Sequence, residues 1–184
     1  LWNNTIKTIA SSSSAIRSDT SNILNISNNI IVTNGSSAHA VSIVTSDNTT
    51  IYSNILNTTN PNNNAYGINL DTTGNNTVTF NLINSSGRGI SISGKSNNNL
   101  SYNNITSVGD AGAGALTLSS VNYNKIHFNQ INSTGANVYG IFFSTTSNHN
   151  ILGENTIRTK DTTSDVNAYF FRSSYNNTIT HDTL

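Results

Sequence analysis

The sequence predicts an all-β solenoid, a single-stranded parallel β-helix of about seven to eight rungs with 22–28 residues in each. Three observations predict this fold. An Asn-centred motif recurs along the whole chain, a second motif with two alternating apolar residues lies between its copies, and no window has the apolar spacing of an amphipathic helix. Each solenoid repeat needs few apolar residues, because the neighbouring repeats complete its core.

The first motif is an aliphatic residue, an Asn three or four positions later, and Ile or Leu two positions after the Asn. Its first copy reads Leu24-Asn28-Ile30 and its sixth Ile151-Asn155-Ile157. Asn tolerates left-handed backbone angles at a bend, and stacked Asn amides can hydrogen-bond to the same group one rung above and below. We therefore interpret the seven motif centres as a buried structural ladder at one bend of every rung. They are Asn28, Asn54, Asn81, Asn103, Asn129, Asn155 and, in the last copy, Asp182.

The second motif is a small residue followed by apolar, any, apolar, as in 40–43, 67–70, 89–92, 115–118, 140–143 and 168–171. A period of two is typical of a short strand with one buried face. By this alternation Phe142 and Phe170 point outward on adjacent rungs, and Ile55 and Leu82 do the same on another face. A further set of Asn residues precedes the aliphatic position of the first motif: Asn4, Asn22, Asn76, Asn98, Asn124 and Asn177.

Composition excludes several classes of function. Asn, Ser and Thr make up 87 of the 184 residues, and the formal net charge is zero. Eight basic and eight acidic side chains provide no surface for nucleic acid. The absence of Cys excludes disulfides and thiolate metal sites, the histidines show no metal-ligand spacing, and no apolar run is long enough to span a bilayer. We expect no cofactor, no bound metal and no transmembrane segment.

The repeat of Asn-any-aliphatic, Asn-any-Ile/Leu and a small residue before an apolar pair resembles that of the right-handed parallel β-helix proteins of the pectate-lyase-like superfamily. The resemblance covers about Asn3 to Leu184 and implies a single right-handed β-helix domain over 1–184, which is part of a longer solenoid or assembles into one. It implies little about function, because the superfamily contains lyases, hydrolases, esterases and non-catalytic surface proteins.

No catalytic residues are identified. Lyases of that superfamily use several Asp on one face with a nearby Arg or Lys, and its hydrolases use paired Asp with Gly-His-Gly. The eight acidic residues here are spread along the repeats at different phases, and neither arrangement is present.

A candidate ligand-binding column lies just before the second motif. The residues at this position include His39, Tyr66, Arg88 and Tyr139, and the first three occupy consecutive rungs at intervals of about 5 Å. The rung of Arg88 is the shortest, which predicts a shallow depression flanked by Tyr66 and Asp110. An aromatic ring beside a guanidinium suits a sugar or an acidic glycan, whereas a cation–π pair that only orders a bend is the alternative.

The leading functional hypothesis is a non-catalytic extracellular or cell-surface protein, similar to Asn/Thr-rich adhesin-like β-helix proteins, that serves in spacing, assembly or glycan adhesion. Two alternatives are a polysaccharide lyase or glycoside hydrolase, and a filament or sheath subunit that associates through open β-helix ends. An ice-binding face is disfavoured, because the positions expected to point outward read Ile31, Asn57, Asn84, Thr106, Asn132 and Arg158 rather than a row of Thr.

Overall fold

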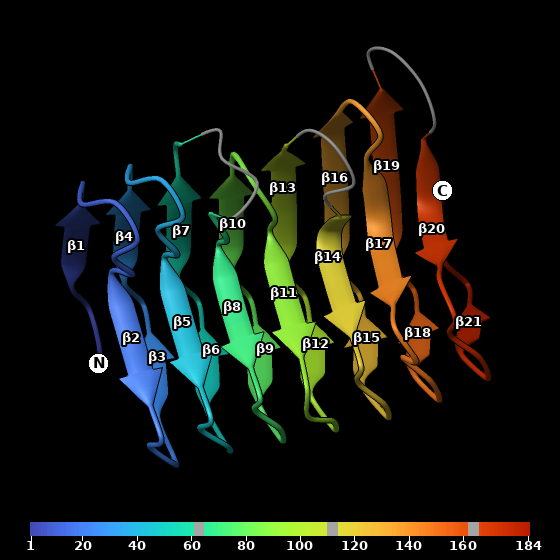
Figure 1. Ribbon diagram of the computed structural model, residues 1–184, viewed down its shortest axis with the longest axis horizontal. Helices are drawn as coiled ribbons and strands as arrows, with labels where there is room; N and C mark the ends of the chain where they lie inside the picture. The colour runs from blue at the N-terminus through green and yellow to red at the C-terminus, as the bar shows by residue number, and fades with distance from the viewer. Residues whose placement is uncertain (61–64, 110–113, 162–165) are drawn as a thin grey trace.

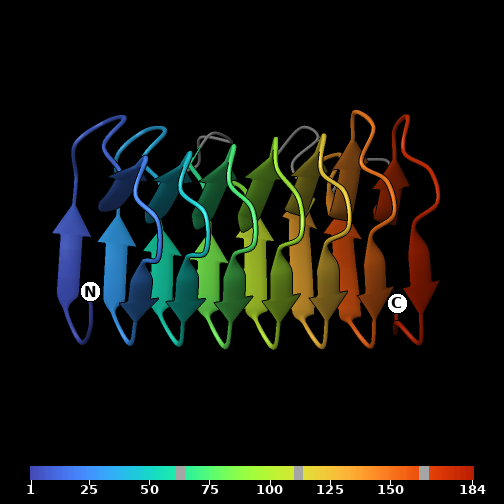
Figure 2. The ribbon, with the colours of Figure 1, turned by 90° about the horizontal axis from the view of Figure 1, so that it is seen from below.

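The computed structural model describes residues 1–60, 65–109, 114–161 and 166–184. It is an elongated parallel β-solenoid whose coils stack side by side along one axis (Figures 1 and 2). Each coil contributes strands to three parallel sheets, and each sheet contains seven strands among the described residues. The predicted all-β solenoid is confirmed, and its size agrees with the expected seven to eight rungs.

Three sheets, here called I, II and III, form the walls of the solenoid. Sheet I consists of β3 (Asn25–Ser27), β6 (Thr50–Tyr52), β9 (Thr77–Thr79), β12 (Asn99–Ser101), β15 (Lys125–His127), β18 (Ile151–Gly153) and β21 (Thr178–Thr180). Sheet II consists of β1 (Thr5–Thr8), β4 (Ile30–Thr33), β7 (Ile55–Thr58), β10 (Leu82–Ser85), β13 (Asn104–Val108), β16 (Gln130–Gly135) and β19 (Thr156–Asp161). Sheet III consists of β2 (Ile16–Asp19), β5 (Val41–Val44), β8 (Ile68–Asp71), β11 (Ile90–Ser93), β14 (Gly114–Ser119), β17 (Tyr139–Ser144) and β20 (Asn167–Phe171).

The core consists of stacked aliphatic columns, because equivalent residues of successive coils pair in register. In sheet II, Ile31 pairs with Leu56, and Leu56 with Ile83. These side chains are fully buried. Sheet III supplies two apolar columns per strand, as the second motif predicts: Ile90 and Ile92 both lie inside. None of the described residues forms a helix of the length and hydropathy that crossing a bilayer requires.

An asparagine ladder runs along the bend between sheets I and II. The Oδ1 atom of Asn103 accepts hydrogen bonds from the backbone N–H and the side-chain Nδ2 of Asn81, at 3.1 and 3.0 Å. The Asn103 Nδ2 donates to Asn129 Oδ1 at 3.0 Å and to the carbonyl oxygen of Val78 at 2.9 Å. This pattern satisfies both ends of a fully buried amide. The same bonds join Asn4, Asn29, Asn54, Asn81, Asn103, Asn129, Asn155 and Asp182.

The expected position of the ladder in the first full coil is wrong by one residue. Asn29 bonds to Asn54, whereas Asn28 lies at the turn with a positive φ of 55°. The buried aliphatic residues of this copy are accordingly Ile26 and Ile31, not Leu24 and Ile30. Two consecutive Asn and two consecutive Ile residues satisfy the same sequence spacing, so the motif alone does not fix the register there.

The left-handed conformation also lies one residue earlier than expected. It falls on the residue before the ladder position: Asn28, Ser53, Phe80, Tyr102, Phe128, Glu154 and His181. These residues share no propensity for positive φ, and only Asn adopts it routinely among them. The hydrogen bonds of the following ladder residue therefore impose the turn. A similar one-residue correction applies to the sixth copy, in which Leu152 is buried and Ile151 is exposed.

A second ladder brackets sheet I on its other side. Asn76, Asn98, Asn124, Asn150 and Asn177 are joined by bonds from Nδ2 to Oδ1. Four of these residues were expected as a set from the sequence. Asn150 was missed, and Asn4 belongs to the first ladder instead. The strands β9, β12, β15 and β18 of sheet I therefore lie between two buried amide columns.

Candidate functional site

The candidate column before sheet III brings three of its expected residues together. The rings of His39 and Tyr66 stack with their centroids 4.6 Å apart at an interplanar angle of 14°. The backbone N–H of Tyr66 donates to His39 Nδ1 at 3.1 Å. Arg88 Nη1 donates to the Tyr66 hydroxyl at 3.0 Å, and its guanidinium carbon lies 5.3 Å from the centre of the Tyr66 ring. The three residues form one continuous half-buried strip across three coils.

The electrostatic environment of this strip favours the neutral form of the His39 imidazole. Burial of the ring, and secondly the positive charge of Arg17, lowers the pKa of His39 below its ordinary value. A neutral ring agrees with the acceptor role of Nδ1. Arg88 supplies a planar guanidinium group with several donors beside this ring. Its Nε atom is buried and has no hydrogen-bond partner among the described residues.

The two other predicted ligand-binding residues are not part of this strip. Asp110 lies outside the described residues. Tyr139 stacks on Phe170 at 4.6 Å and approaches Phe142 at 5.3 Å, two coils beyond Arg88. Phe142 and Phe170 lie on the outer face of sheet III as expected, and Arg172 covers the Phe142 ring at 5.8 Å.

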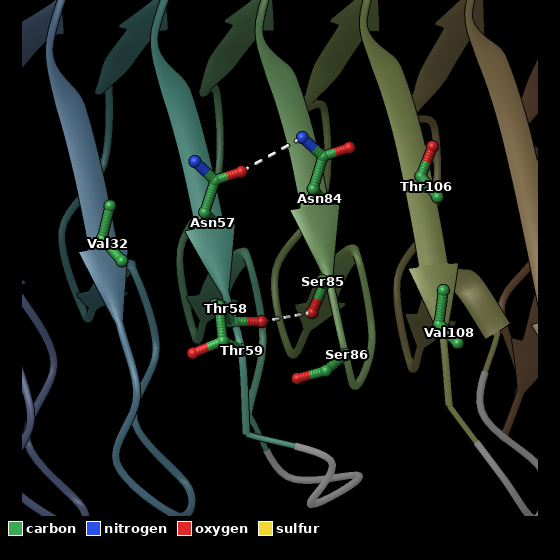
Figure 3. A pocket seen from close by; sticks show the side chains of 9 residues that line it. All are labelled: Val32, Asn57, Thr58, Thr59, Asn84, Ser85, Ser86, Thr106 and Val108. Atoms are coloured by element: carbon green, nitrogen blue, oxygen red, sulfur yellow. Dashed lines mark hydrogen bonds between the residues drawn. The ribbon is translucent and has the colours of Figure 1, made fainter.

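A groove of about 400 Å³ lies on the outer face of sheet II (Figure 3). Its floor is formed by Asn57 on β7, Asn84 on β10 and Thr106 on β13, and Val32 and Val108 lie at its sides. The Asn84 Nδ2 donates to Asn57 Oδ1 at 3.1 Å, so the two exposed amides are held in line across neighbouring strands.

Hydroxyl groups lie at the strand ends of this groove. Thr59 and Ser86 extend its lining past β7 and β10. Beneath them the buried hydroxyls of Thr58 and Ser85 bond to each other at 2.7 Å, which fixes the backbone from which the lining residues project. The groove therefore combines polar groups with the methyl groups of Val32, Thr106 and Val108.

Sequence reasoning placed Asn57, Asn84 and Thr106 on the outer face but did not identify a groove. It also placed Ile31 in this outer row, which is wrong: Ile31 is fully buried and Val32 occupies the outer position. The one-residue error in the ladder register of that coil caused this misplacement. The hollow itself depends on how the strand ends and following loops project, which the motif spacing does not reveal.

Donor groups for metal ions are dispersed over the molecule. His39 lies before sheet III, His127 ends β15, and His149 stacks on Tyr123 at 5.2 Å. His181 follows β21. Among the described residues, no three His, Asp or Glu side chains come close enough together to hold an ion.

Residues 56–184 match the model of a protein family described as periplasmic copper-binding protein (NosD). No curated protein and no solved structure matches the chain.

Proposed function

Because this chain belongs to the periplasmic copper-binding protein (NosD) family, we propose that it is a non-catalytic β-solenoid of the cell envelope whose sheet II groove binds polysaccharide. The periplasmic character of the family supports a location outside the cytoplasm. A role in adhesion or spacing at the cell surface accords with the rod shape of the solenoid (Figure 2).

The residues of this chain do not fit a copper site. Copper in proteins takes thiolate, thioether and imidazole ligands. The 184 residues contain no Cys and no Met. The four histidines lie on different coils, and His39 Nδ1 already accepts a hydrogen bond from the Tyr66 backbone. We therefore derive no copper chemistry for this chain.

The amide pair in the groove is the observation that carries the proposal. Asn57 and Asn84 are linked side chain to side chain, yet each amide retains further donor and acceptor capacity toward the groove. Sugars present hydroxyl groups at the ring edge and C–H groups on the ring face, so amides flanked by methyl groups match both. Equivalent outer positions repeat at the strand spacing of about 4.8 Å, close to the length of one sugar residue in an extended polysaccharide.

The strip of His39, Tyr66 and Arg88 supports a second contact for acidic sugars. A carboxylate that pairs with the half-buried Arg88 guanidinium beside the Tyr66 ring would form a charge-assisted hydrogen bond. The strip would determine which glycans bind more tightly, whereas the groove would bind both neutral and acidic glycans.

A glycan array with neutral β-glucan, mannan and xylan and acidic polygalacturonate and alginate tests the proposal. We expect binding to at least one polymer, and Asn84→Ala is expected to weaken it about five- to tenfold because amide hydrogen bonds are lost. The matched control is Asn104→Ala, an exposed Asn of sheet II outside the groove. Arg88→Ala is expected to reduce binding of the acidic polymers alone.

Two outcomes would contradict the proposal. One is the absence of binding to every polymer, or binding that Asn84→Ala leaves unchanged. The other is the release of reducing ends or unsaturated products from a bound polymer, which would indicate a carbohydrate-active enzyme instead.

A further inference from the structure

An aromatic stack forms an exposed ridge at the corner between sheets I and II. Phe80, Tyr102 and Phe128 occupy successive coils, and their rings stack at 5.0 and 4.9 Å with interplanar angles of 4° and 5°. Their exposed fractions are 53, 49 and 40%. Tyr52 extends the ridge by one coil with an edge contact to Phe80 at 5.8 Å. We call these four residues the aromatic corner.

Folding does not require aromatic residues at this corner. The three stacked residues occupy the left-handed position before the ladder, with φ near 57° in each. The same position holds Asn28 and Ser53 on earlier coils, and Asn suits positive φ better than an aromatic residue does. An unfavourable backbone conformation combined with exposed apolar rings indicates that the rings serve an interaction.

The shape of the ridge favours a protein surface over a sugar. A sugar ring stacks on the face of an aromatic ring, but the facing sides of Phe80, Tyr102 and Phe128 cover one another and leave mainly ring edges exposed. Beyond the ladder residue, Ile55 and Leu82 lie on the coils of Tyr52 and Phe80, and Ile30 extends this exposed apolar row by one coil. On the coils of Tyr102 and Phe128 the same row continues with Asn104 and Gln130. Ring edges and an aliphatic row suit another apolar ridge.

We propose that the aromatic corner is a self-association surface on which a second copy of this chain packs antiparallel, with the two Tyr102 side chains facing each other. Phe80 of one copy then lies opposite Phe128 of the other. This proposal does not depend on the polysaccharide groove, which is lined by residues two or more positions further along the same strands, such as Asn57 and Asn84.

The residues that flank the stack fit the antiparallel arrangement. The coil of Tyr52 and Ser53 lies two coils before that of Tyr102, and the coil of Gly153 and Glu154 lies two coils after it. In the antiparallel dimer, the first of these coils in one copy therefore lies opposite the second in the other copy. In this arrangement the Glu154 carboxylate lies opposite the hydroxyl groups of Tyr52 and Ser53. A parallel arrangement would place Glu154 against Glu154, and like charges that face each other are destabilising.

The available area is adequate for a dimer. Aromatic side chains present about 150–250 Å² each when fully accessible. The four rings, 40–53% exposed, and the aliphatic row, 38–44% exposed, together present several hundred Å². A standard interface buries roughly 800 Å² on each partner. The corner therefore provides most of the apolar centre of such an interface.

Single cysteines test the arrangement directly, because the chain contains none. With a short bis-maleimide, we expect Tyr102→Cys to cross-link to itself. Phe80→Cys and Phe128→Cys should form no cross-link when each is alone and should cross-link to each other when they are mixed. Asn69→Cys, on the outer side of β8 in sheet III, is the matched control and should not cross-link.

Light scattering over a range of concentrations supplies the second measurement. The wild-type chain is expected to form dimers, and Tyr102→Asn should weaken association about tenfold or more. Asn suits the left-handed turn, so the variant should retain its circular dichroism spectrum. A wild-type chain that stays monomeric at millimolar concentration would overturn the proposal, and so would self-cross-linking of Phe80→Cys and Phe128→Cys, which indicates parallel packing.

Discussion

Replacing Asn103 by Ala is expected to lower the free energy of unfolding by about 3–5 kcal/mol. Asn103 Oδ1 accepts two hydrogen bonds from Asn81, and its Nδ2 donates to Val78 and Asn129. The truncation removes all four bonds and leaves the buried amide of Asn81 and the carbonyl of Val78 without these partners. Denaturant unfolding followed by circular dichroism measures the loss.

The adjacent residue provides the control for this variant. Asn104 has the same side chain but is exposed at the start of β13, so Asn104→Ala should change the free energy of unfolding by less than about 0.5 kcal/mol. Equal effects of the two substitutions would mean that the ladder does not stabilise the coil beyond ordinary Asn residues of the surface.

Replacing Phe143 by Ala is expected to cost about 3–5 kcal/mol because it leaves a cavity in the core. Phe143 is the largest of the fully buried side chains, and its ring stacks on Phe171 at 4.6 Å. On the other side, Phe143 pairs in register with Leu118 of the preceding coil. The neighbouring residues of sheet III therefore lose contacts on both sides of the cavity, and the thermal midpoint should fall accordingly.

Phe142→Ala is the matched control, since Phe142 lies on the outer side of the same strand. It loses contacts with Phe170 and Arg172 but opens no buried cavity, so the expected cost is about 1 kcal/mol. A larger loss of stability for Phe142→Ala than for Phe143→Ala would contradict the assignment of the inner and outer faces.

The sequence predicts the fold because the residues that specify it repeat at fixed spacing. Asn81, Asn103 and Asn129 occupy one buried bend, and an aliphatic residue two positions later always points inward. The register of the first motif is wrong where neighbouring residues offer two equivalent registers, as at Asn28 and Asn29. There the choice depends on which amide reaches the next coil.

The outer surface was less predictable, because it has no repeating composition. The left-handed turn position holds Ser53, Phe80, Glu154 and other unrelated types, since the adjacent ladder imposes its conformation. The aromatic corner becomes visible only when the coils are aligned on the ladder residue. The groove of sheet II depends on the projection of strand ends, which no residue pattern encodes.

The contact of His39, Tyr66 and Arg88 could be predicted because all three residues directly precede the second motif. Alignment on that motif places them on consecutive coils, and the structure brings their side chains into contact. Tyr139 follows the same alignment but stacks on Phe170 instead, because Gly114 occupies the coil between Arg88 and Tyr139.

Nuclear magnetic resonance of the ¹⁵N-labelled protein during titration with an oligosaccharide tests whether the groove of sheet II binds polysaccharide. Hexaoses of β-glucan, xylan, mannan and polygalacturonate are the ligands to use. We expect shifts of the Asn57 and Asn84 side-chain amide signals and of the Thr106 backbone amide signal, whereas the signals of the control residue Asn69 on sheet III should not change. Shifts centred on sheet III or on the aromatic corner, or no shift with any of the four hexaoses, would contradict this expectation.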